Sequence, residues 1–282
     1  MTTDFMQLIE RAWQEKDSLV CVGLDPDVGK IPVHLRGLAN PLFQFNKAIV
    51  DATADLACAF KPQIAYYAAV GAERDLELTI AYIHQNYPAV PVILDAKRGD
   101  IGATAEMYAR EAFDRYRADA VTVNPYMGGD TLAPFLARKD KGVVILCRTS
   151  NPGAGDLQDL TADGKRLYQI VAEKAATSWN YHHNVLLVVG ATFPEELAEI
   201  RAIAPETPFL VPGIGAQGGD VKAAVNAGKT KNGTGMIVNS SRGIIYAGAG
   251  DDFAAAARRA AAALRDEINR YRQGAPPDAL TA

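Results

Sequence analysis

The chain has 282 residues, of which 49% are hydrophobic and 22% charged, an ordinary composition for a globular protein. Its net charge of −4 argues against a protein that coats nucleic acid, but a local cluster of positive charge could still bind a small anion. Apolar runs are too short to span a bilayer, and the first residues lack the charged and apolar regions of a secretory leader. We therefore expect a cytoplasmic protein that works without a membrane.

Hydrophobic segments of strand length alternate with helical patterns along the whole chain. After a leading helix over 4–16, the segments predicted as buried strands are 19–24, 57–60, 90–94, 120–123, 143–147, 185–189, 209–211 and 236–238. The helical patterns that follow them lie at 41–55, 68–86, 101–117, 130–138, 164–179, 194–203, 220–227 and 253–271.

Eight apolar strands alternating with helices predict an α/β fold with a parallel sheet covered by helices. Eight such units in this length are typical of a (β/α)8 TIM barrel, here a single domain over residues 1–273. An open doubly wound sheet is the alternative, but it would expose edge strands, and none of these segments has that character. We expect the tail, 274–282, to be disordered.

The three cysteines each lie within an apolar run and at unrelated spacings, at Cys21, Cys58 and Cys147. This pattern predicts reduced, buried thiols, with neither a metal motif nor a disulfide framework.

The stretch from Val90 to Thr104 carries the strongest signal of chemistry. An apolar strand leads into Asp95 and Lys97, which share one face of an extended strand, and Asp100 follows before the next helix. Two acids bracketing one lysine at a strand end suggest a catalytic device. The structural alternative is an Asp95–Lys97 ion pair, with Asp100 as the N-cap of the helix that starts at Ile101.

Polar residues also follow several of the other predicted strands. They are Asp25, Lys61, Asn124, Ser150, the loop 212–219 and Arg242. In a barrel these positions meet at the carboxyl end, where active sites of this fold are built. Five charged groups after the first three strands favour a catalytic site over structural ion pairs.

The loops after the last two strands indicate a phosphate site. Glycines at 213, 215, 218 and 219 leave backbone amides open to close approach, and a helix starts shortly afterwards. The last strand ends in Ser-Ser-Arg-Gly, which brings the Arg242 guanidinium beside them. Ordinary flexible turns are the alternative.

Residues 95–104, Asp-Ala-Lys-Arg-Gly-Asp-Ile-Gly-Ala-Thr, resemble the signature of the orotidine 5′-phosphate decarboxylase family, and the likeness covers the whole barrel. The family's Lys–Asp–Lys–Asp array is matched by Lys61, Asp95, Lys97 and Asp100. The other positions that the resemblance assigns are the ribose-binding acid Asp25, Ser150 at the pyrimidine, the lid residue Gln217, the phosphate-binding Arg242, and the substrate contacts Pro212 and Gly215.

The resemblance implies decarboxylation of a nucleotide, orotidine 5′-phosphate, to UMP without a metal or an organic cofactor. Lys97 would stabilise the carbanion at C6 and then protonate it. The family's two-fold homodimer implies shared active sites, to which Asp100 and Thr104 of each chain reach across. The chain is similar to the longer bacterial branch, with extra residues around 153–163 and 229–234.

Three alternatives use the same residues differently. A Mg²⁺-dependent sugar-phosphate decarboxylase or aldolase of related barrel type would need an acid where Lys61 stands, and a cation there repels a divalent ion. A Schiff-base aldolase needs a lysine of lowered pKa, which Asp95 and Asp100 oppose. A non-catalytic phosphate-binding barrel leaves the acids around Lys97 unexplained.

Overall fold

The computed structural model describes residues 4–214 and 220–273. A leading helix, α1 (Phe5–Glu15), confirms the first predicted element, and the Asp4 carboxylate caps it by accepting the Met6 amide at 2.8 Å. The predicted tail, 274–282, lies outside the described residues.

Eight strands of the described residues form one parallel sheet, in the order β2-β1-β10-β9-β8-β5-β4-β3. Their bounds are β1 (Val20–Leu24), β2 (Ala59–Pro62), β3 (Ile93–Arg98), β4 (Ala120–Val123), β5 (Gly142–Arg148), β8 (Val185–Val189), β9 (Phe209–Pro212) and β10 (Met236–Ser240). Two single bridges, Phe60 to Val92 and Gln63 to Asp95, join β2 to β3 and close the barrel. The predicted (β/α)8 barrel is confirmed.

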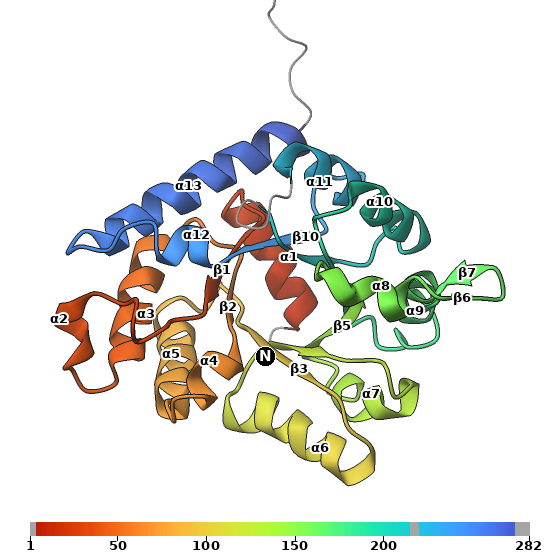
Figure 1. Cartoon of the computed structure of the whole chain (residues 1–282), viewed down its shortest axis with the longest axis horizontal. Helices are drawn as coiled ribbons and strands as arrows, with labels where there is room; N and C mark the ends of the chain where they lie inside the picture. Colours follow the sequence, from red (N-terminus) through yellow and green to blue (C-terminus); the bar gives the residue numbers. More distant parts are fainter. Residues whose placement is uncertain (1–3, 215–219, 274–282) are drawn as a thin grey trace, which may run out of the picture.

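Helices surround this barrel (Figure 1). The longer ones are α3 (Pro41–Thr53), α5 (Glu73–Asn86), α6 (Gly102–Arg110), α7 (Gly129–Leu136), α9 (Leu167–Ala176), α10 (Pro194–Ile203), α11 (Val221–Gly228) and α13 (Phe253–Arg272). A π-helical turn, η1 (Glu111–Arg115), continues α6. Short helices are α2 (Val33–Arg36), α4 (Ile64–Ala68), α8 (Gly155–Gln158) and α12 (Arg242–Ile245).

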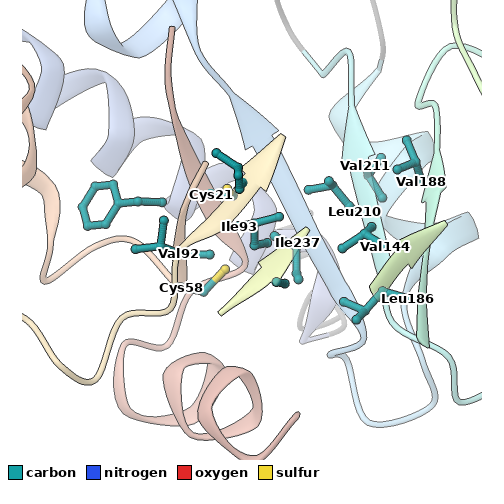
Figure 2. Packing of buried hydrophobic residues seen from close by; sticks show 14 of the residues in the cluster. Cys21, Cys58, Val92, Ile93, Val144, Leu186, Val188, Leu210, Val211 and Ile237 are labelled. Carbon is teal, nitrogen blue, oxygen red and sulfur yellow. The ribbon is translucent and has the colours of Figure 1, made fainter. Parts of the chain in front are cut away.

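The strands are buried on both faces, which explains why they are apolar throughout rather than alternating. Inside the barrel, apolar side chains from several strands gather into one cluster; Figure 2 labels Cys21, Ile93, Val144, Leu210 and Ile237 among them. All three cysteines are free and buried, as predicted. None of the described helices is long and apolar enough to span a membrane.

Several predicted boundaries were wrong. The helix expected over 68–86 starts at Glu73, because Gly71 has a φ of 65°, and Ile64–Ala68 forms a separate helix. The helix expected over 164–179 starts at Leu167 because the preceding residues form a small hairpin. Its strands, β6 (Thr161–Ala162) and β7 (Lys165–Arg166), connect to the η2 turn (Pro152–Ala154) and α8.

Candidate active site

One buried carboxylate holds two lysines at the carboxyl end of the barrel. Lys61, on β2, donates from Nζ to Asp95 Oδ2 at 2.9 Å, and Lys97 donates from Nζ to Asp95 Oδ1 at 2.6 Å. The Lys61 side chain is 5% exposed and that of Lys97 46%. The cluster therefore has a sealed cation on one side and an accessible cation on the other.

Mutual attraction keeps this cluster charged despite its burial. Burial alone would raise the pKa of Asp95, but Lys61 and Lys97 together outweigh it and hold that pKa well below its ordinary value. Burial would likewise lower the pKa of Lys61, but Asp95 and then Asp25 outweigh it and raise that pKa above its ordinary value. At neutral pH the site therefore holds a carboxylate and a buried ammonium.

The backbone that carries Lys97 is not a regular strand. Strand β3 was predicted to end at Leu94, but it continues to Arg98, with an irregularity in its pairing to β4 between Leu94 and Arg98. Lys97 has a φ of 48°, in the left-handed region that non-glycine residues rarely adopt. Asp95 and Lys97 do meet, but strict strand alternation is not the reason.

Asp100 is not hydrogen-bonded to this cluster within the described part of its own chain. Its carboxylate accepts the Ile101 amide at 2.8 Å, and within the described residues it makes no hydrogen bond to Lys97. The structural alternative, in which Asp100 is the N-cap, is wrong, because α6 begins at Gly102 and Ile101 occupies the N-cap position. Thr104 follows on the exposed surface of α6.

Those predicted substrate-binding residues that follow strands and that the structure describes lie at the same end of the barrel. Asp25 follows β1, and its buried Oδ1 has no hydrogen-bond partner among the described residues. Ser150 is half-buried just after β5, Pro212 ends β9, and Arg242 is exposed at the start of α12. Gly213 has a φ of 96°, which agrees with the predicted turn. Gly215, Gln217, Gly218 and Gly219 lie outside the described residues.

The residues around 153–163 brace the end of β5, a role that the sequence did not reveal. Gln158 accepts the Thr149 amide at 2.9 Å and donates to the Thr149 hydroxyl at 2.8 Å, directly beside Ser150. Arg148 makes a bidentate pair with Glu196 at 2.6 and 2.7 Å. Glu196 is 48 residues from Arg148 and Gln158 is nine from Thr149, and no helical or strand periodicity links either pair.

Two further residues beside Asp95 and Lys97 escaped sequence analysis. Arg98 pairs bidentately with Glu111 of the η1 turn at 2.9 and 3.0 Å, with its guanidinium 4.7 Å from the Tyr108 ring centroid. Thr122, on β4, contacts Asp95 at 2.9 Å. The only available signal for Thr122 was a hydroxyl within the otherwise apolar run Ala-Val-Thr-Val.

The Lys–Asp–Lys cluster lies at the carboxyl ends of the strands, which is where (β/α)8 barrels have their active sites. The protein is therefore of the class of (β/α)8 barrels whose active site is an arrangement of charged groups. The family model described as "Orotidine 5'-phosphate decarboxylase / HUMPS family" matches residues 18–260. The chain belongs to this family.

Named relatives agree with this assignment along nearly the full length. The chain is 62% identical to orotidine 5'-phosphate decarboxylase of Azoarcus sp. over 268 residues, covering 95% of this chain and 99% of the relative. Identity to that of Ralstonia pickettii is 60% over the same shares. The solved Leishmania donovani OMP decarboxylase superposes with a TM-score of 0.84 at 41% identity, covering 97% of this chain and 100% of that one.

Proposed function

We propose that this chain decarboxylates orotidine 5′-phosphate to UMP in de novo pyrimidine biosynthesis, using its own side chains without a metal or an organic cofactor. The observation that carries the proposal is the Lys61–Asp95–Lys97 cluster, in a chain that belongs to the decarboxylase family. We also propose that the enzyme works in the cytoplasm.

The chemistry explains why a lysine is needed. Loss of CO₂ from C6 of the pyrimidine leaves a carbanion that no adjacent carbonyl delocalises. A cation held where that charge develops lowers the barrier, because it binds the transition state more tightly than the ground state. Lys97 is the accessible cation, and it then delivers a proton to C6. Asp95 and Lys61 hold it in place.

The remaining predicted residues would bind the substrate around this cluster. Asp25 Oδ1, which has no partner in the described part of the chain, suits a ribose hydroxyl, because a buried acceptor is costly until a donor reaches it. Ser150 would meet the pyrimidine. We assign the phosphate to Pro212, Gly215, Gln217 and Arg242, among which the Arg242 guanidinium supplies the positive charge.

We further propose a homodimer in which Asp100 and Thr104 complete the site of the partner chain. Within the described part of its own chain, Asp100 accepts the Ile101 amide and makes no hydrogen bond to Lys97. Large apolar side chains are exposed at Ile101 (61%), the next residue, at Met107 (58%) on α6 and at Tyr126 (76%) after β4, which is the type of surface that a protein interface covers. A two-fold axis would exchange the two loops reciprocally.

Mixing inactive variants tests the shared site. Lys97→Ala and Asp100→Ala should each be nearly inactive, but a hybrid dimer would contain one intact site. Equal mixing makes about half of the dimers hybrid, so roughly a quarter of wild-type activity should return. Lys97→Ala mixed with Asp95→Ala is the matched control, because both sites of that hybrid are defective. No recovery despite proven subunit exchange contradicts the shared site.

Turnover tests the activity itself. Addition of the purified chain to orotidine 5′-phosphate should remove the absorbance of the orotidylate and produce UMP, with and without excess chelator. The Mg²⁺-dependent sugar-phosphate chemistry remains the alternative, and Lys61 argues against it since a cation there opposes a divalent ion. A strict requirement for Mg²⁺ would favour that alternative.

A further inference from the structure

Thr122 joins the side chain of Asp95 to the backbone of Lys97. Its Oγ1 accepts the amides of Ala96 and Lys97, each at 2.9 Å, and donates to Asp95 Oδ1 at 2.9 Å. The side chain is 1% exposed, in the middle of β4. One hydroxyl thus contacts three consecutive residues of β3.

The direction of these hydrogen bonds is fixed. Asp95 is ionised, so it can only accept, and the single proton of the hydroxyl must point to it. Both lone pairs of Oγ1 are then left for the two amides. The hydroxyl is fully satisfied in this arrangement, and no side chain without an oxygen at this position could make the same contacts.

The two amides report an unusual backbone. In a regular strand, successive amides point to opposite sides, whereas those of Ala96 and Lys97 converge on one oxygen. This convergence accompanies the left-handed φ of 48° at Lys97, a conformation that is sterically unfavourable for a residue with a side chain. Such a conformation persists only where its surroundings hold it.

We propose that Thr122 is a positioning residue for decarboxylation, whose hydroxyl holds the Lys97 backbone and the Asp95 carboxylate in the geometry that aims the Lys97 ammonium at C6. This rests on the function proposed above. The hydroxyl also orients Asp95 so that Oδ1 faces Lys97 while Oδ2 faces Lys61. Without it, the carboxylate can rotate and the Lys97 backbone can relax to a common conformation.

The test compares variants that differ by the hydroxyl. Thr122→Val keeps the shape but removes the oxygen, and should lower kcat by about 10²-fold, the scale of a displacement of about 1 Å at the reacting centre. KM should change less than about threefold, since the contacts to ribose and phosphate remain. Thr122→Ser retains the hydroxyl and should recover kcat to within about threefold of the wild type.

Two controls separate positioning from stability. Thr53→Val removes another fully buried hydroxyl, which donates to the Ile49 carbonyl within α3, and should leave kcat unchanged. Thr122→Ala, a second variant without the hydroxyl, is assayed in parallel in case the valine variant fails to fold. Urea midpoints are measured for all four variants.

The outcomes are distinct. An unchanged kcat in a folded Thr122→Val or Thr122→Ala variant, or a Thr122→Ser variant as impaired as the valine variant, overturns the positioning role. A rise in KM with an unchanged kcat also overturns the positioning role, because it would mean that Thr122 contributes to substrate binding. If the wild type itself fails to turn over orotidine 5′-phosphate, the proposed function fails, which no comparison among the variants would imitate.

Discussion

The two ends of the barrel stabilise buried cations in opposite ways. At the carboxyl end, Lys61 binds a carboxylate, Asp95. At the amino end, Arg201 on α10 is 9% exposed, and its partners among the described residues are all backbone carbonyls, those of Ala204, Pro205, Thr207, Gly228 and Gly235, at 2.7–3.2 Å. Its guanidinium lies 3.6 Å from the Phe209 ring centroid.

The electrostatic consequences differ accordingly. Burial lowers the pKa of Arg201 to about 10, since carbonyls satisfy its donors without neutralising its charge and Glu206 opposes the effect only partly. The pKa of Lys61 moves the other way. Arg201 fastens the loops that lead into β9 and β10, whereas the carboxyl end keeps a charged cluster that can act on a substrate. Only the second arrangement should be needed for catalysis.

The largest effect is expected from Asp95→Asn. The change is nearly isosteric, but it removes the charge that holds both lysines, so kcat should fall by about 10³-fold, on the scale of losing a preorganised electrostatic group. Steady-state kinetics on orotidine 5′-phosphate, with circular dichroism to verify folding, measures this. A kcat within tenfold of the wild type would show that Lys97 works without its carboxylate.

Arg201→Met should lower the stability of the protein and leave its activity intact. The apolar side chain fills similar space but leaves buried carbonyls without donors, so the free energy of unfolding should fall by about 3 kcal/mol or more. In a temperature range where the variant stays folded, kcat should remain within about twofold of the wild type. Urea unfolding and kinetics test both statements, with Arg201→Lys as a control that keeps the charge. A large drop in kcat would contradict the division between the ends.

Low pH should change the free energy of unfolding differently at Asp95 and at Arg201, with a smaller effect than the substitutions themselves. The pKa of Asp95 lies below its ordinary value of 3.8 in the folded chain, so its stabilising contribution is complete above that value and is lost as the pH falls through it toward the folded pKa. The gap in unfolding free energy between wild type and Asp95→Asn should therefore narrow below about pH 4. The gap for Arg201→Met should stay constant, because arginine does not titrate there. Urea titrations across this range decide; parallel curves for both variants would refute the assignment.

The smallest effect is expected at an exposed pair. Arg258 and Asp55 form a bidentate contact at 2.6 and 2.7 Å, but the side chains are 48% and 57% exposed. Asp55→Asn should therefore cost less than about 1 kcal/mol of unfolding free energy, and less still in high salt. A cost comparable to that of Arg201→Met would mean that burial does not separate these sites.

The eight strands and the charged cluster could be predicted because their signals are local. Each strand is a short apolar run, and the closure of a parallel barrel brings all the strand ends together, so Lys61 and Asp95 meet although they are far apart in sequence. The extent of β3 could not be predicted, since residues 95–98 lack an apolar strand pattern. They are held against β4 by hydrogen bonds to Thr122 and by an irregular pairing.

Features set by contacts between remote segments were also inaccessible. The β6–β7 hairpin and the contact between Gln158 of α8 and Thr149 depend on how an insertion packs, which no periodicity encodes. The left-handed backbone at Lys97 runs against the local preference of a lysine. The meeting of Lys61, Asp95 and Lys97 was therefore predictable, but the backbone conformation that carries Lys97 was not.

The line where the barrel closes has a consequence for how the protein loses activity on heating. Strands β2 and β3 are joined there by two single bridges instead of a continuous ladder, and the Lys61–Asp95 ion pair crosses the same line. A brief separation of β2 from β3 would break the Lys61–Asp95 ion pair while the other strands of the barrel stay paired. Activity should therefore be lost at a lower temperature than the helical circular dichroism signal. A bound nucleotide should bring these two temperatures together, because it stabilises the paired arrangement of β2 and β3.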